Sequence, residues 1–176
     1  MKPMDEEAKQ KLISVFEFEG GDRVAEAIGS SSDRIRRAFS ELFSGYRLTA
    51  EEVLNETVRV EDYSGVVTIK DIAFYSYCEH HFAPFFGTAD VSYEPREIIT
   101  GLGKIVRLVH DVHARRLHIQ ELMTRDIALD IMRVLDAKGA RVTTRAKHLC
   151  MCSRGPSDHN AITEVTYGAG TLQPTS

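Results

Sequence analysis

The sequence predicts an α+β protein: an antiparallel β-sheet with two long helices packed on one face, preceded by a helical N-terminal arm. Apolar and polar residues alternate with the period of strands between residues 57 and 93 and again between 140 and 168. Between these regions, residues 104–135 carry apolar side chains at helical intervals. This order favours a sheet covered by helices on one side. We expect the arm to cover residues 1–48 and the main domain residues 49–176.

The N-terminal arm is expected to contain two helices. Residues 5 to about 16 have an amphipathic pattern, which Gly20–Gly21 ends. A second helix is expected to start near Ser30–Ser32, because serine hydroxyls are good N-caps, and to end at Gly45. Its apolar stripe would consist of Ile35, Phe39, Leu42 and Phe43.

The main domain is expected to contain five strands. They are predicted at residues 57–60, 66–75, 85–93, 140–147 and 161–168. The first two would form a hairpin around the turn Tyr63–Gly65, and the last two would pair across a loop that carries cysteines.

Two helices are expected between the strand groups, at residues 104–116 and 119–135. The core-facing positions of the second helix would be Ile119, Met123, Ile127, Ile131 and Val134 or Leu135. His110 and His113 share one face of the first helix, and we expect both to be solvated rather than bound to metal.

Composition limits the classes of function. The chain has 176 residues, 43% of them apolar, which is enough for one hydrophobic core. Its formal net charge of -4 argues against a general nucleic-acid binder, so a polyanionic ligand would be held by a local basic cluster. Its 3 cysteines do not make a disulfide framework, and no secretory signal or membrane span is visible. We therefore expect a cytoplasmic protein without a membrane or nucleic-acid partner.

Cys78, His81 and Cys150 carry the ligand types of a zinc site. Two thiolates and one imidazole give Zn²⁺ three protein ligands, and a fourth tetrahedral corner left to water is typical of a catalytic zinc. The spacing of Cys78 and His81 lets one tight turn aim both side chains at an ion, whereas Cys150 must be brought in by the fold. These residues are predicted to bind zinc.

Two further histidines, His80 and His148, lie beside the predicted ligands in the sequence. A zinc-bound water has a pKa of roughly 7 and a free imidazole one of about 6.5, so both can exchange protons at neutral pH. The main alternative is a closed structural zinc with His80 or His148 as the fourth ligand. Cys152 is expected to be an inert neighbour, on the same face of an extended segment as Cys150.

Two other groups of residues suit a nucleotide. Gly101–Lys104 opens a helix, where backbone N–H groups and the helix dipole favour phosphate, and Arg107 lies one turn further on. Arg154 adds a guanidinium that fits phosphate oxygens. Gln120–Glu121 suits a purine edge, since a carboxylate accepts from a guanine amino group and ring N–H. In isolation, each of these groups is more often solvated surface.

Four ordered motifs together resemble the GTP cyclohydrolase I family, from about Arg34 to Gly170. They are Phe74–Gly87, Gly101–Lys104 with Arg107, Ala114–Glu121, and His148–Met151 with Arg154–Gly155. The resemblance implies a T-fold subunit whose sheets form a barrel within a toroidal homo-oligomer, typically a decamer. The active sites would lie at subunit interfaces.

The resemblance also implies a role for each motif residue. The implied zinc ligands are Cys78, His81 and Cys150. The implied proton-transfer groups are His80 and His148, and the implied guanine contacts are Gln120 and Glu121. The triphosphate would be held by Lys104, Arg107, Arg154, Arg34 and Arg37. Gly103 stands where the family usually has serine near the ribose and phosphates.

The implied reaction is hydrolysis of GTP at C8, with His80 protonating N7. Ring opening, release of formate and rearrangement of the ribose would then give 7,8-dihydroneopterin triphosphate, a precursor of folate or other pterins. Two alternatives remain open. A related enzyme would stop at a ring-opened pyrimidine or use another purine nucleotide. A non-catalytic protein would bind a purine or pterin and hold a structural zinc.

Overall fold

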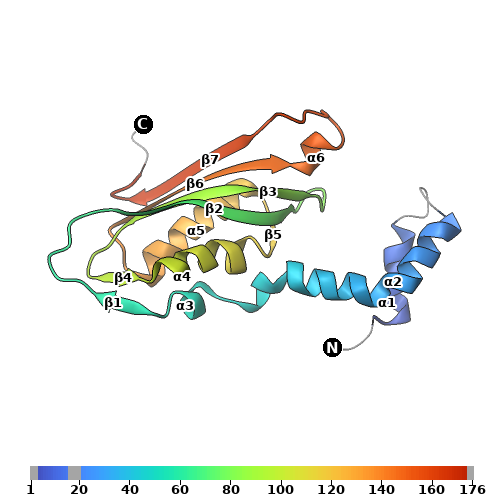
Figure 1. Cartoon of the computed structure of the whole chain (residues 1–176), viewed down its shortest axis with the longest axis horizontal. Coiled ribbons are helices and arrows are strands. Elements are labelled where there is room, and N and C mark those ends of the chain that lie inside the picture. The colour runs from blue at the N-terminus through green and yellow to red at the C-terminus, as the bar shows by residue number, and fades with distance from the viewer. Residues whose placement is uncertain (1–3, 16–20, 174–176) are drawn as a thin grey trace. The chain divides into compact units, whose positions relative to one another are not determined.

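The computed structural model describes residues 4–15 and 21–173 of the chain. It contains two compact units, Met1–Leu42 and Phe43–Ser176 (Figure 1). The first is helical and the second contains the sheet. Within the described ranges, no helix is long and apolar enough to cross a membrane.

The N-terminal unit consists of α1 (Glu6–Ser14) and α2 (Gly21–Leu42). The start of α1 is confirmed: the Asp5 carboxylate accepts a hydrogen bond from the Ala8 N–H at 2.8 Å and caps the helix. The predicted end at Phe16 and the break at Gly20 fall outside the described residues.

The predicted start of the second helix near Ser30–Ser32 is wrong, because α2 already begins at Gly21. The serines are interior residues whose hydroxyls bond back to their own helix. Ser30 donates to the Ala27 carbonyl at 3.1 Å, and Ser32 donates to the Gly29 carbonyl at 3.4 Å. A hydroxyl satisfied in this way does not interrupt a helix, so the apparent N-cap signal has no effect here.

The second unit is built on a five-stranded sheet of order β5-β2-β3-β6-β7. The strands are β2 (Val67–Cys78), β3 (Pro84–Glu94), β5 (Leu117–His118), β6 (Gly139–His148) and β7 (Thr163–Gly170). Strands β2, β3, β6 and β7 pair antiparallel, and the short β5 joins the edge of β2 in parallel. The predicted antiparallel sheet and the pairing of its last two strands are confirmed.

The predicted hairpin between the first two strands is wrong. β1 (Thr57–Arg59) pairs with β4 (Ile98–Thr100) in a separate two-stranded sheet. All residues of β1 are exposed. Burial of one face therefore does not specify its partner, and local alternation identifies the strand without identifying the pairing.

Helices α4 and α5 lie on the same side of the sheet (Figure 1). The helical segments of this unit are η1 (Ser44–Arg47), α3 (Ala50–Val53), α4 (Leu102–Arg107), η2 (Leu108–His113), α5 (Gln120–Val134) and α6 (Leu149–Cys152). The predicted core positions of α5 are confirmed at Met123, Ile127, Ile131 and Leu135, all 0% exposed. They pack in one cluster with alternate residues of β2, β3 and β6.

The helix predicted at residues 104–116 changes its winding at Leu108. After α4, the segment η2 is a π-helix, in which the Ala114 N–H donates to the Val109 carbonyl at 2.8 Å. The prediction that His113 is solvated is wrong, since its side chain is 2% exposed. His110, by contrast, keeps 45% of its side chain exposed and lies 2.7 Å from the Asp111 carboxylate.

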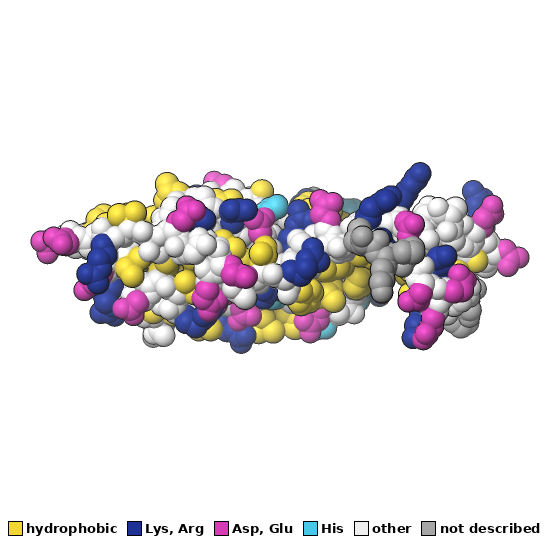
Figure 2. All heavy atoms as spheres, turned by 90° about the horizontal axis from the view of Figure 1, so that it is seen from below, with side chains coloured by type: hydrophobic (Ala, Val, Ile, Leu, Met, Phe, Trp, Pro, Cys, Tyr) yellow, Lys and Arg dark blue, Asp and Glu magenta, His cyan; other side chains and the backbone are white. Residues whose placement is uncertain are grey.

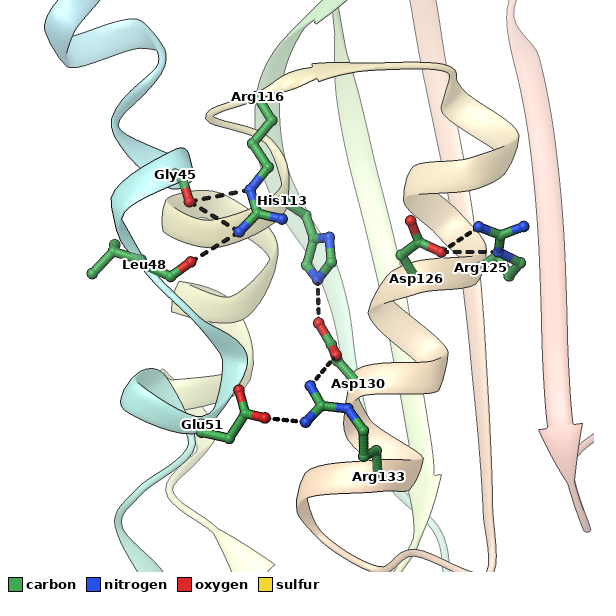
Figure 3. Close-up of polar contacts among 9 residues, drawn as sticks. All are labelled: Gly45, Leu48, Glu51, His113, Arg116, Arg125, Asp126, Asp130 and Arg133. Carbon is green, nitrogen blue, oxygen red and sulfur yellow. Dashed lines mark hydrogen bonds and ion pairs between the residues drawn. The ribbon is translucent and has the colours of Figure 1, made fainter.

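A series of ion pairs among side chains of α3, η2 and α5 connects these three helical segments (Figure 3). His113 Nε2 donates to Asp130 Oδ2 at 3.0 Å, and Arg133 donates to Asp130 Oδ1 at 2.6 Å. Arg133 also contacts the carboxylate of Glu51. Burial opposes ionisation of Asp130, but the bonds from His113 and Arg133 outweigh it and lower its pKa.

The guanidinium of Arg116 holds the first residues of the sheet-containing unit, in the segment before α3 (Figure 3). It donates to the carbonyl of Gly45 at 3.0 Å and to that of Leu48 at 2.9 Å. The Gly45 N–H in turn donates to the Arg115 carbonyl at 3.1 Å. The segment before α3 is therefore held against the end of η2 by backbone groups and one cation.

The surface carries both signs of charge. Figure 2 shows Lys and Arg side chains interspersed with Asp and Glu over the face that it presents. With a formal net charge of -4, the chain has no excess of cations that would attract polyanions over long range.

Gly87→Ala is expected to destabilise the protein strongly. Gly87 lies in the central strand β3, and an added Cβ would overlap the backbone carbonyl oxygen of Arg145 on β6. We expect the free energy of unfolding to fall by roughly 2–4 kcal/mol in a urea titration. Gly103→Ala is the control, since its Cβ would meet nothing within 4 Å and alanine favours the helix by up to about 1 kcal/mol. Equal stabilities of the two variants would contradict this account.

Asp130→Asn is expected to lower the free energy of unfolding at neutral pH by about 1.5–3 kcal/mol, because charged hydrogen bonds are lost. The lowered pKa of Asp130 means that its contribution is present above the unfolded value and disappears as the pH falls through the folded value. The wild type should therefore lose more stability than the variant on acidification below about pH 5. Asp126→Asn is the control, since Asp126 pairs with Arg125 at the surface and should change stability by about 0.5 kcal/mol or less.

Candidate metal and substrate site

A pocket of about 220 Å³ collects most of the residues singled out in the sequence. Its lining includes Cys78, His80, His81, Gln120, Glu121, His148 and Cys150. A larger hollow of about 700 Å³ is lined by residues 59–64, Arg96, Glu97 and Lys138. That lining has no histidine or cysteine, and its arginines and lysine are in ion pairs. The smaller pocket is therefore the candidate functional site.

Strand ends bring the reactive side chains together. β2 ends at Cys78 and continues into a tight turn, in which the Phe82 N–H donates to the Cys78 carbonyl and the Cys78 N–H to the Ala83 carbonyl, both at 2.8 Å. β6 ends at His148, and α6 follows with Cys150 in its first turn. β2 and β6 both run antiparallel to β3, which lies between them, so they run in the same direction. Their C-terminal ends therefore lie side by side at the same end of the sheet.

Cys78, His148 and Cys150 could hold a metal ion, because their ligand atoms all lie within 4.8 Å of one another. His81 also approaches, with Nδ1 3.8 Å from Cys78 Sγ. Zinc bonds of about 2.3 Å to sulfur and 2.0 Å to nitrogen place tetrahedral ligands roughly 3.6 Å apart, which this separation fits. Two thiols with imidazole nitrogens are the ligand types that zinc prefers.

The environment of Cys150 suits a cation. Burial raises the pKa of its thiol, and the neighbouring Cys78 raises it further. Two thiols side by side in a buried place resist ionisation unless a positive charge neutralises them. The remaining cysteine, Cys152, is also buried. It lies in the short helix α6, so the prediction of an extended segment with Cys150 and Cys152 on one face is wrong.

His148 is held at both its edge and its face. Its Nε2 lies 2.7 Å from Gln120 Oε1, and its ring stacks on Phe85 with centroids 4.6 Å apart. Burial lowers the pKa of His148, and the charge of Glu121 opposes this shift. His80 and His81 follow β2 in the exposed turn, with ring centroids 6.2 Å apart and planes inclined at 70°.

Gln120 and Glu121 occupy different environments at the start of α5. Gln120 is 2% exposed, and its amide donates to Thr144 and to the Thr163 carbonyl. Glu121 is exposed and lines the pocket. The general expectation that such a pair lies on the helix surface therefore fails for Gln120, because the start of α5 packs against the sheet.

His118 also lines the pocket, although the sequence analysis did not single it out. Burial, followed by the nearby His113, lowers the pKa of His118 to about 4. Its position two residues before Gln120, in the short strand β5, is the signal that could have identified it. Thr144 was missed as well, since a threonine inside a strand carries no motif.

The basic residues predicted to hold phosphate do not line this pocket. Lys104 lies 3.1 Å from the Glu56 carboxylate, and Arg107 lies 3.1 Å from that of Asp111. Helix α4, which carries both cations and Gly103, begins beside β4, at the end of the unit away from α6 (Figure 1). Arg154 is exposed, and its positive charge lies near enough to Cys150 to oppose the rise in the pKa of that thiol.

Arg34 and Arg37 belong to α2 in the N-terminal unit, and both are exposed. The structure thus brings to one pocket the predicted cysteines and histidines and the Gln120–Glu121 pair, namely Cys78, Cys150, His80, His81, His148, Gln120 and Glu121. It places Lys104 and Arg107 elsewhere on the same unit.

Comparisons with known sequences agree on one family. The family model described as GTP cyclohydrolase I matches residues 8–176. GTP cyclohydrolase 1 of Sinorhizobium fredii is 39% identical over 98% of this chain and 84% of its own length. GTP cyclohydrolase 1 of Pelagibacter ubique is 41% identical over 96% of this chain and 84% of its own length. By this match over nearly its whole length, the chain belongs to the GTP cyclohydrolase I family.

Proposed function

We propose that the protein is a zinc-dependent GTP cyclohydrolase I, which opens the guanine imidazole ring at C8 and forms formate and 7,8-dihydroneopterin triphosphate. One observation carries the proposal. A single pocket joins a cluster able to hold a metal ion to three further histidines, His80, His81 and His118, and to the carboxylate of Glu121. Ring opening of a purine needs an activated water, proton donors and a fixed base, and this pocket supplies groups for each task.

Cys78, Cys150 and His81 would hold the zinc ion. A bound zinc lowers the pKa of its water to about 7 and so supplies hydroxide at neutral pH. His80, exposed in the turn after β2, would protonate N7 of the purine. His148 would exchange protons on the other side of the site, where Phe85 and Gln120 hold its ring.

Substrate binding would use the remaining residues of the motifs. The exposed carboxylate of Glu121 would accept from the guanine amino group and ring N–H, next to Gln120. The triphosphate would be bound by cations: Lys104, Arg107, Arg154, Arg34 and Arg37. Gly103 leaves open space at the start of α4, since an added Cβ would meet no atom within 4 Å.

The complete site would form between subunits of a homo-oligomer with a T-fold barrel, as a decamer. Support comes from the separation within one chain, where Lys104 and Arg107 do not line the pocket that holds Cys78 and Cys150. A single GTP molecule that engages both groups would need the α4 end of another copy. We further propose a cytoplasmic location, without nucleic-acid or membrane partners, and a division into an arm of residues 1–48 and a catalytic domain of residues 49–176.

One observation favours a second candidate, a non-catalytic purine-binding protein with a structural zinc. The ligand atom of His148 lies within 4.8 Å of those of both cysteines, so four protein ligands could close the metal site. Such a protein would retain zinc but would not consume GTP. Incubation with GTP, with formate quantified and the product identified by mass, separates the candidates. Formate without dihydroneopterin triphosphate would instead indicate an enzyme that stops at a ring-opened pyrimidine.

Cys150→Ala and His80→Gln are both expected to abolish formate release, for different reasons. Removal of the Cys150 thiol deletes a metal ligand, so the zinc content of the purified protein should fall with the activity. Removal of the His80 imidazole deletes a proton donor, so zinc should remain bound. Zinc content would be measured by elemental analysis, and His159→Gln, an exposed histidine outside the pocket lining, is the control. Full activity in Cys150→Ala or His80→Gln would contradict the assigned roles.

Mixing two inactive variants is expected to restore activity if neighbouring subunits share the site. Cys150→Ala and Lys104→Ala should each be inactive alone. In co-assembled oligomers, some interfaces receive an intact metal cluster from one copy and an intact Lys104 from the other. We expect a measurable fraction of wild-type formate release from co-expressed variants and none when the purified oligomers are simply combined without exchange. No recovery in verified mixed oligomers would place the whole site in one chain.

A further inference from the structure

Three threonine and glutamine side chains form a buried network beneath the ring of His148. Gln120 is 2% exposed, and Thr124 and Thr144 are each 0% exposed. The His148 ring lies at the end of this network, with Nε2 2.7 Å from Gln120 Oε1 and with one face on Phe85. Buried polar groups of this kind must satisfy one another, so the direction of each hydrogen bond can be worked out.

Two backbone carbonyls fix the orientation of the Gln120 amide. Its Nε2 lies 3.2 Å from the Thr144 carbonyl oxygen on β6 and 3.1 Å from the Thr163 carbonyl oxygen on β7. Carbonyl oxygens can only accept, so the NH₂ group must face them and Oε1 must face His148. The opposite orientation would set Oε1 against both carbonyls.

The hydroxyl groups continue the same order. Thr124 Oγ1 donates to the Gln120 carbonyl at 2.7 Å, which uses its only hydrogen. Thr144 Oγ1 must then donate to Thr124 Oγ1 at 2.7 Å, and it accepts from Gln120 Nε2 at 3.0 Å. Both hydrogens of the Gln120 amide are therefore committed inside the protein, and Oε1 remains as an acceptor aimed at His148.

We propose that Gln120, supported by Thr144, is a positioning residue that holds neutral His148 as its Nε2–H tautomer. Oε1 has lone pairs and no hydrogen, so Nε2 of His148 must carry the proton of this 2.7 Å bond. The lone pair of the ring is then on Nδ1. That atom is the one left to bind a metal ion or to take a proton, and Phe85 sets the plane in which it points.

This inference deepens the proposed function and rests on it only for the catalytic consequence, because the tautomer can be measured without turnover. It gives Gln120 a task other than contact with the guanine edge. Glu121, exposed in the pocket, keeps its carboxylate available for the base. Thr144 becomes a residue that affects the site without touching a substrate.

The tautomer is read directly from the ring nitrogens by ¹⁵N NMR of the whole protein labelled at histidine, with the His148 signals assigned by their loss in His148→Gln. We expect a protonated Nε2 and an unprotonated Nδ1 in the wild type. Gln120→Leu removes the acceptor and should give a mixture of tautomers. Thr144→Val removes one support of the amide and should shift the mixture less, whereas Thr144→Ser keeps the hydroxyl and should restore the wild-type signals.

Steady-state kinetics of formate release supply the second readout. Loss of a group that orients a catalytic histidine typically costs about 10–100-fold, so kcat of Gln120→Leu should fall by that factor with little change in KM. Thr143→Val is the matched control, because its hydroxyl pairs with Thr166 on the exposed face, away from Gln120. It should leave both the tautomer and kcat unchanged.

Three results would overturn the inference. One is an Nδ1–H tautomer of His148 in the wild type. A second is an unchanged tautomer in both Gln120→Leu and Thr144→Val. The third is a rise in KM alone for Gln120→Leu, which would return Gln120 to the guanine edge. If Gln120→Leu does not fold, the Thr144→Val and Thr144→Ser pair decides the question. Absence of formate release by the wild type would contradict the proposed function and leave the tautomer measurement valid.

Discussion

The register of β3 between its two neighbours is the constraint on which the site depends. Phe85 lies opposite Ser76 of β2 and opposite His148 of β6, so β6 ends at this level and β2 ends slightly beyond it, at Cys78. The end of β2 provides Cys78, and the turn of helix after β6 provides Cys150. Because side chains alternate along a strand, a shift of either pairing by one residue would turn these groups to the other face of the sheet. Two thiols from distant parts of the sequence meet only because these pairings are fixed.

Packing and polar satisfaction reinforce the same arrangement. The ring of Phe85 is fully buried in the core, and one face of it stacks against the ring of His148. The Gln120 amide bonds to carbonyls of β6 and β7, so the start of α5 is tied to the strands beside the pocket. Loss of one partner in such a buried network leaves another group unsatisfied, which is costly in a low-dielectric interior. Precise placement of the site therefore rests on the fold as a whole.

Sequence reasoning recovered the elements whose signals are local. The core positions of α5, the strand β3 and the pair β6–β7 follow from periodicity alone. The partner of β1 did not, since a fully exposed three-residue strand has no buried face to specify it. The serines inside α2 misled because their hydroxyls can cap a helix or bond within one. At the candidate site, motif spacing pointed to the cysteines and histidines that line the pocket, but the contacts of His118 with the pocket and of Thr144 with Gln120 arise between strands and helices and leave no local pattern in the sequence.

The π-helix η2 makes the interior of the unit sensitive to chain length at one place. Each residue of an α-helix turns the chain by about 100°. Removal of one residue from the π-helical turn would therefore rotate α4, which precedes it, by about that angle relative to the segment that follows. His113 would then leave Asp130, and the cations of α4 would point in a new direction relative to the sheet. Insertions and deletions between Leu108 and Ala114 would thus re-aim Lys104 and Arg107 while leaving the cluster of Cys78, His148 and Cys150 in place.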